Sequence, residues 1–107
     1  MPVFREPVIL CVDDDHSILA LYYARFSLDG YRCVPCESLG AATAMVHVVP
    51  VALAVLDYDV PGTNGVEIAR CLRAIRPSIP LVLNSSNLAV CKEDINIFDA
   101  VHTKGHP

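Results

Sequence analysis

The sequence of 107 residues has few basic residues, with eight Lys and Arg against twelve Asp and Glu, and a formal net charge of −4. The basic residues are scattered. Only Arg70, Arg73 and Arg76 follow a pattern, which we expect to form one solvated face of a helix. A surface that binds nucleic acid or an anionic membrane needs clustered Lys and Arg. The charge therefore argues against both classes of partner.

Long apolar runs are also absent. The most apolar run, residues 46–56, is interrupted by His47 and Pro50, whereas crossing a bilayer takes about 18 apolar residues. The N-terminus lacks the basic region and apolar segment of a secretory signal. Five cysteines, an odd number at irregular spacing, fit a reducing compartment better than a disulfide framework. We therefore expect a cytoplasmic protein, and the length predicts one domain over residues 1–107.

Short apolar runs alternate with helical patterns along the chain. We expect strands at 7–12, 31–36, 51–56, 80–83 and 100–103. We expect helices at 16–28, 39–49 and 65–76, and a weak one at about 91–98. Asp15 or His16, Ser38 and Asn64 stand at the N-cap positions of the first three helices. Pro35 suits an edge strand. This alternation predicts an α/β fold with a parallel sheet and right-handed crossovers.

Polar residues follow the predicted strands where each one ends. They are Asp13 and Asp14, Asp57 and Asp59, Ser85, and Lys104. Because the carboxyl ends of parallel strands meet at one edge of a sheet, we expect these side chains to converge. Neighbouring carboxylates repel unless a cation neutralises them, and hard oxygen ligands suit Mg²⁺ or Mn²⁺ rather than zinc. A lysine and a hydroxyl at the same edge suit phosphate, so the set predicts phosphoryl transfer.

Four segments at this edge carry a family resemblance. They read VILCVDDD at 8–15, VLDYDVPGTNG at 55–65, LVLNSS at 81–86 and TK at 103–104. In this order and spacing, the chain resembles the receiver domain of bacterial two-component response regulators over nearly its whole length. The resemblance implies a five-stranded parallel sheet in the order 2-1-3-4-5, flanked by helices on both faces. It also implies a phosphorylated signalling domain rather than a stand-alone metabolic enzyme.

The resemblance assigns roles to the acidic residues. Asp57 is expected to be the phosphoacceptor, attacking a phosphohistidine of a sensor kinase or phosphotransfer protein, and phosphorylation is expected to change the binding of a downstream protein partner. Asp14 is expected to bind Mg²⁺ directly and Asp13 to assist through water. Asp57 itself and the backbone carbonyl of Asp59 are expected to complete the protein ligands.

The phosphoryl-binding residues match the family only in part. Ser85, with Ser86 beside it, is expected to hydrogen-bond the phosphoryl group, and Lys104 is expected to pair with the phosphoryl oxygens. Family members often carry Tyr or Phe at the position of Val101, where the ring reports on phosphorylation. Lys104 is usually followed by proline, whereas Gly105 follows it here.

The resemblance also predicts missing helices. Lys104 comes only 19 positions after Ser85, which predicts a shortened fourth helix, and the three residues after Lys104 leave no room for a fifth. We expect no output domain. A sheet face beside the first helix is then expected to be bare in the single chain. Either the sequence is truncated, or a second subunit covers this face.

Other functions use the same residues differently. A haloacid-dehalogenase-type phosphatase would use Asp57 as nucleophile and Asp59 as general acid, but it needs an inserted flap and an acidic pair after the lysine. A receiver-like interaction module that is never phosphorylated is a second alternative, because Val101 replaces the aromatic switch. Cys33 and Cys36 form a Cys-x-x-Cys spacing that suits thiol redox chemistry, although free cysteines commonly fill cores.

A histidine metal site is a weaker hypothesis. The four histidines lack a paired spacing on one helix face. They are His16, His47, His102 and His106.

Overall fold

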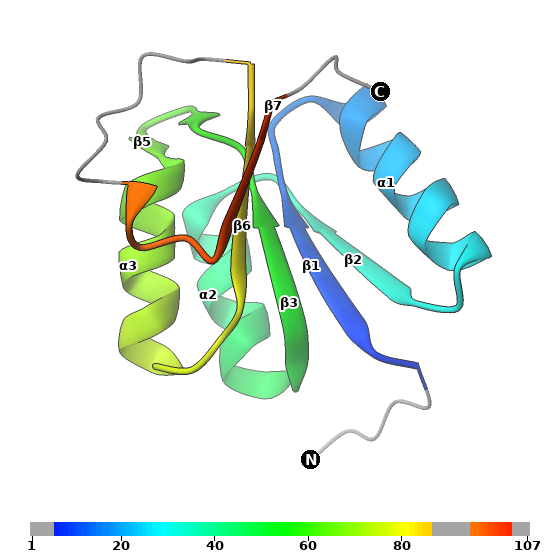
Figure 1. Ribbon diagram of the computed structural model, residues 1–107, viewed down its shortest axis with the longest axis horizontal. Helices are drawn as coiled ribbons and strands as arrows, with labels where there is room; N and C mark the ends of the chain where they lie inside the picture. Colours follow the sequence, from blue (N-terminus) through cyan, green and yellow to red (C-terminus); the bar gives the residue numbers. More distant parts are fainter. Residues whose placement is uncertain (1–5, 87–94, 104–107) are drawn as a thin grey trace.

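A central parallel sheet organises the protein in the computed structural model, which describes residues 6–86 and 95–103 (Figure 1). Its strands are β1 (Val8–Val12), β2 (Arg32–Cys36), β3 (Val51–Leu56), β6 (Leu81–Ser85) and β7 (Ala100–Thr103). They lie in the order β2-β1-β3-β6-β7 and every pairing is parallel. The predicted α/β fold and the order 2-1-3-4-5 are confirmed.

Helices cover both faces of the sheet. Helix α1 (His16–Leu28) lies on one face, and α2 (Leu39–Val48) and α3 (Gly65–Ile75) lie on the other (Figure 1). The predicted caps form, because the side chains of Asp15, Ser38 and Asn64 each accept a hydrogen bond from the first turn of the following helix. These are the three α-helices of the described residues. Of the expected helix at 91–98, residues 91–94 lie outside them, and of the rest Ile95 is helical while residues 96–98 are not.

The core is divided by the sheet into two clusters of unequal size. In β1, Val8, Leu10 and Val12 face the larger cluster under α2 and α3, while Ile9 and Cys11 face the smaller one under α1. The alternation follows from the pleat, because successive side chains of a strand point to opposite faces. All five positions are buried, as expected for a central strand between two layers.

The α1 face is the less completely packed one. Within α1 only Leu19 is buried, and Leu28 is 84% exposed. Helix α1 is the one helix that the described residues place on this face (Figure 1). The expectation that a second subunit covers it stays a prediction. No helix in the described part of the chain has the length and apolar character needed to cross a bilayer.

Two strand features differ from expectation. Strand β6 continues through Asn84 and Ser85 rather than ending at Leu83, because β7 pairs with it at both positions. A small antiparallel hairpin, β4 (Asp59–Val60) and β5 (Thr63–Asn64), lies between β3 and α3, where no strand was expected. Its turn contains Gly62 at φ +80°, a backbone angle that glycine adopts without steric cost.

The expected solvated arginine face is wrong for two of its three members. Arg70 pairs with Glu67 on the exposed side of α3. Arg73 instead donates to the carbonyl of Ile79 and pairs with Asp99, and Arg76 donates to carbonyls at the end of α2. The spacing of arginines along a helix predicts the direction of each Cα–Cβ bond but not the position of the guanidinium. The long side chain can reach backbone acceptors on neighbouring elements.

Candidate functional site

The acidic residues converge at the carboxyl edge of the sheet, as predicted. Asp13 follows β1 and Asp57 follows β3, and these strands are neighbours with Val12 opposite Leu56. The backbone N–H of Asp57 donates to the carbonyl of Val12 at 2.9 Å, which ties the two strand ends together. Carboxylate oxygens of Asp13, Asp14 and Asp57 all lie within 4.8 Å of one another. This edge is the upper one in Figure 1.

Burial distinguishes the three carboxylates. Asp13 is 1% exposed and Asp57 is 8% exposed, whereas Asp14 faces solvent. Two hydrogen bonds hold the main chain and the side chain of Asp13. Its backbone N–H donates to the carbonyl of Cys36, and its side-chain Oδ1 accepts from the N–H of Asp15 at 3.0 Å. The site therefore has two buried carboxylates and an exposed one at its mouth.

These carboxylates fit a hard divalent cation. Three anionic groups this close repel one another, and burial of two of them increases the cost because less water screens the charge. Oxygen donors with an open side toward solvent are the ligand set that Mg²⁺ and Mn²⁺ take in proteins. The group is the one set of three or more metal-ligating side chains among the residues that the structure describes. Among the described residues, no histidine belongs to such a set, so the structure gives no support to a histidine metal site.

The segment after Asp57 is held against the start of α3. The backbone N–H of Gly65 donates to the carbonyl of Tyr58 at 2.8 Å, and Asp59 pairs with Asn64 in the hairpin. The Asp59 side chain is exposed and does not belong to the acidic group. The sequence prediction concerned its backbone carbonyl, and that ligand role stays a prediction.

The hydroxyl and the lysine expected at this edge have different outcomes. Ser85 ends β6, beside β3, and is 4% exposed, so it lies at the carboxyl edge as expected. Ser86 is the exposed residue after it. Thr103 lies opposite Ser85 on β7, and Lys104 follows Thr103 outside the described residues. Val101, at the position of the aromatic switch, is 48% exposed.

Cys33 and Cys36 fill the core, which the sequence favoured over a redox Cys-x-x-Cys pair. Cys33 packs in the α1 cluster and Cys36 in the larger core, so the two thiols lie on opposite faces of β2. Cys33 Sγ instead lies 3.5 Å from Cys11 Sγ. Burial raises the pKa of Cys33 and of Cys11, and raises the pKa of Cys36 to about 11. Since a reactive thiol needs a lowered pKa, these buried thiols are core residues.

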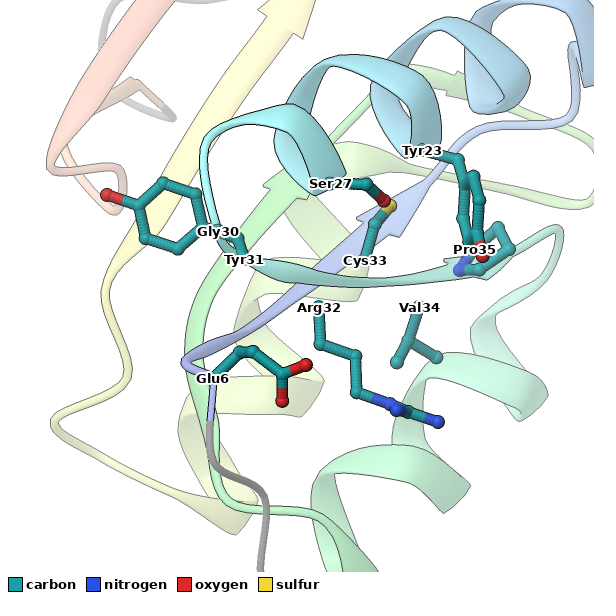
Figure 2. Close-up of a pocket in the computed structure, with 9 residues that line it drawn as sticks. All are labelled: Glu6, Tyr23, Ser27, Gly30, Tyr31, Arg32, Cys33, Val34 and Pro35. Atoms are coloured by element: carbon teal, nitrogen blue, oxygen red, sulfur yellow. The ribbon is translucent and has the colours of Figure 1, made fainter.

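Two hollows that sequence reasoning missed lie away from the acidic edge. The hollow in Figure 2, of about 350 Å³, runs along β2 and the end of α1, with Tyr23, Ser27 and Cys33 in its lining. A second, of about 530 Å³, lies beside the start of α1, where His16 pairs with Glu37. Neither is lined by an acidic residue of the site.

Known proteins share this arrangement of sequence and fold. The response regulator receiver domain family matches residues 9–100. The phosphate regulon transcriptional regulatory protein PhoB of Pseudomonas aeruginosa is 32% identical over 77 residues, which are 70% of this chain and 34% of that protein. The chain thus aligns with about a third of the length of this relative.

Solved structures share the fold at low identity. A CheY-like receiver domain from Methanospirillum hungatei superposes with a TM-score of 0.86 at 22% identity, covering 95% of this chain and 84% of that one. Response regulator TrrA of Thermotoga maritima, solved in complex with Mg²⁺ and BeF, gives 0.85 at 23% identity, covering 92% and 86%. With the family match over most of its length, the chain belongs to the response regulator receiver domain family.

Proposed function

We propose that Asp57 accepts a phosphoryl group from a phosphohistidine of a sensor kinase or phosphotransfer protein in a reaction that depends on Mg²⁺ or Mn²⁺. The modification then changes the binding of a downstream protein partner. One observation carries the proposal. Three carboxylates from two neighbouring strand ends lie within 4.8 Å of one another, and a buried hydroxyl ends the next strand.

The residues divide the chemistry between them. A carboxylate oxygen of Asp57 attacks phosphorus, so an O–P bond forms while the P–N bond to the donor breaks. Asp13 and Asp14, with the backbone carbonyl of Asp59, would hold the metal ion. That ion, when bound, supplies the positive charge that lets an anionic phosphoryl group approach carboxylates.

The new phosphoryl oxygens need hydrogen-bond donors. We assign these to the hydroxyl of Ser85, which is already buried at this edge, and to Lys104. Ser86 lies beside them, exposed. The open position of the site suits a protein donor, because a phosphohistidine on another protein must reach Asp57 from solvent.

The structure favours this function over the phosphatase alternative. Between Asp57 and α3 the chain contains only the short β4–β5 hairpin, whereas the phosphatase mechanism needs an inserted flap at this point. The family match also points to the receiver. The non-phosphorylated interaction module keeps one supporting observation, the aliphatic Val101 at the position of the aromatic switch.

Intact mass after incubation with Mg²⁺ and phosphoramidate tests the proposal. The parent is expected to gain one phosphoryl group with release of ammonia, and Asp57→Asn is expected to gain none. Equal modification of both proteins would show that another residue is the acceptor. An unmodified parent would support the interaction module.

The metal assignment is tested with neighbouring carboxylates. Asp14→Asn removes a ligand, whereas Asp15→Asn makes the same charge change one residue later and keeps an N-cap of equal quality. Because a bound ion stabilises the folded state, Mg²⁺ should raise the melting temperature of the parent and of Asp15→Asn, and much less that of Asp14→Asn. An equal response of all three would contradict the assignment.

A further inference from the structure

A chain of three polar side chains crosses the sheet face that α1 covers. It joins Tyr22 of α1, Asn84 of β6 and His102 of β7. The Asn84 side-chain Nδ2 donates to the Tyr22 hydroxyl, and Asn84 Oδ1 lies 3.0 Å from His102 Nδ1. Because an amide oxygen can only accept, this geometry requires the proton of the neutral imidazole on Nδ1.

Apolar side chains surround the Tyr22 end of this polar chain, while its His102 end is exposed. Tyr22 stacks on Phe26 with ring centroids 5.8 Å apart, and Leu53 and Val82 pack in the same cluster. A side-chain amide placed against such a surface costs free energy unless both of its polar atoms are bonded. Tyr22 and His102 supply both partners, so they fix the position of the Asn84 side chain.

Asn84 stands directly before the buried hydroxyl of the acidic edge. Asn84 and Ser85 are neighbours on β6, and the pleat points their side chains to opposite faces of the sheet. Their partners on β7 are His102 and Thr103. A displacement of Ser85 toward Asp57 therefore moves the peptide that carries Asn84, and its hydrogen bonds weaken steeply as they lengthen or bend.

Val101 cannot supply an equivalent signal. Its side chain lies on the sheet side that Leu83 faces, is 48% exposed, and has no hydrogen-bonding group. Asn84, one residue before Ser85, instead makes directional hydrogen bonds to two other elements, α1 and β7.

We propose that Asn84 couples phosphorylation of Asp57 to the α1 face of the sheet, through its hydrogen bonds to Tyr22 and His102. The inference rests on the proposed phosphoacceptor function. The bonds are made when Asp57 is unmodified and are broken when Ser85 moves to the phosphoryl group. Because coupling is reciprocal, the same bonds favour the unmodified state, and their loss makes phosphorylation easier.

A pair of tyrosine variants isolates the coupling. Tyr22→Phe removes the acceptor for Asn84 and keeps the ring that stacks on Phe26. Tyr31→Phe is the matched control, since it removes a hydroxyl outside the polar chain from a ring that also contacts Phe26. Phosphorylation by phosphoramidate is followed by intact mass, and the Asn84 amide and His102 ring are followed by NMR in the same samples.

In the parent and in Tyr31→Phe, the Asn84 and His102 signals should shift as the phosphoryl group appears. Tyr22→Phe should be phosphorylated about fivefold faster, because one hydrogen bond of roughly 1 kcal/mol no longer has to break as Ser85 moves to the phosphoryl group in the transition state. Phosphorylation without movement of these signals, or equal rates for the two variants, would overturn the coupling and leave the proposed function standing. An unmodified parent would overturn both, and the mass alone identifies that case.

Discussion

Replacing Gly65 by alanine tests how the backbone holds the segment of Asp57, the proposed phosphoacceptor. A Cβ atom built on Gly65 would lie 2.4 Å from the carbonyl oxygen of Asp57 and 3.1 Å from the Cα of Tyr58. Ordinary contacts between such atoms begin near 3.5 Å, so the segment must retreat by about 1 Å. That movement strains the hydrogen bond from Gly65 N–H to the Tyr58 carbonyl.

The expected cost follows from opposing effects. Overpacking against backbone costs about 1–3 kcal/mol and a weakened hydrogen bond about 1 kcal/mol. The helix preference of alanine raises the free energy of unfolding by about 0.5–1 kcal/mol, because alanine loses less conformational freedom than glycine in a helix. We therefore expect Gly65→Ala to lower the free energy of unfolding by about 2 kcal/mol. In urea this moves the unfolding midpoint down by about 1 M, and phosphorylation of Asp57 should slow because its main chain has moved.

Gly40→Ala in α2 is the matched control. A Cβ there meets nothing within 4 Å, so only the helix preference of alanine acts, and the protein should become slightly more stable. If Gly65→Ala were as stable as Gly40→Ala and were phosphorylated at the parental rate, the close approach of α3 to Asp57 would not constrain the site.

Two further predictions concern the core and the end of α2. The unfolded chain loses the Cys36 proton near pH 9.0 while the folded protein keeps it to about pH 11, so stability should fall as pH rises through that interval. Urea unfolding across the interval should show a shallower fall for Cys36→Val, and an unchanged slope would contradict the raised pKa. Arg76→Met should cost about 1–3 kcal/mol in urea unfolding, because the guanidinium donates to the Val46 carbonyl at 2.8 Å, while the exposed pair lost in Arg70→Met should cost under about 1 kcal/mol. Equal costs would refute the distinction between the two arginines.

Sequence periodicity predicted the fold well because the two central strands β1 and β3 are continuous apolar runs with a clear end. Val8–Val12 and Val51–Leu56 are such runs, and both stop at an aspartate. The end of β6 was missed for a physical reason. Asn84 and Ser85 look like turn residues by themselves, but pairing with β7 makes them strand, and pairing is a long-range property that local composition does not encode.

Topology explains why much of the site was also predictable. Once the strands are parallel, residues that follow them must meet at one edge, whatever the side chains do. What could not be predicted depends on side-chain reach and on facing direction. The sequence places Cys33 and Cys36 close together, yet the pleat puts them on opposite faces, while Cys11 meets Cys33 from the neighbouring strand. Likewise, nothing local connects Tyr22 with Asn84.

Two adjacent residues at the end of β6 face opposite sides of the sheet and have different roles. Ser85 faces the large core and the acidic edge, where burial holds the hydroxyl that we propose binds the phosphoryl group. Asn84 faces α1, and its amide is hydrogen-bonded to Tyr22 and His102. Because the pleat separates the two faces, substitutions at Tyr22 or His102 can alter the response without touching the carboxylates. A variant of this chain can therefore lose the coupling to the α1 face and still be phosphorylated. Such a variant would show that the coupling and the phosphorylation chemistry depend on different residues.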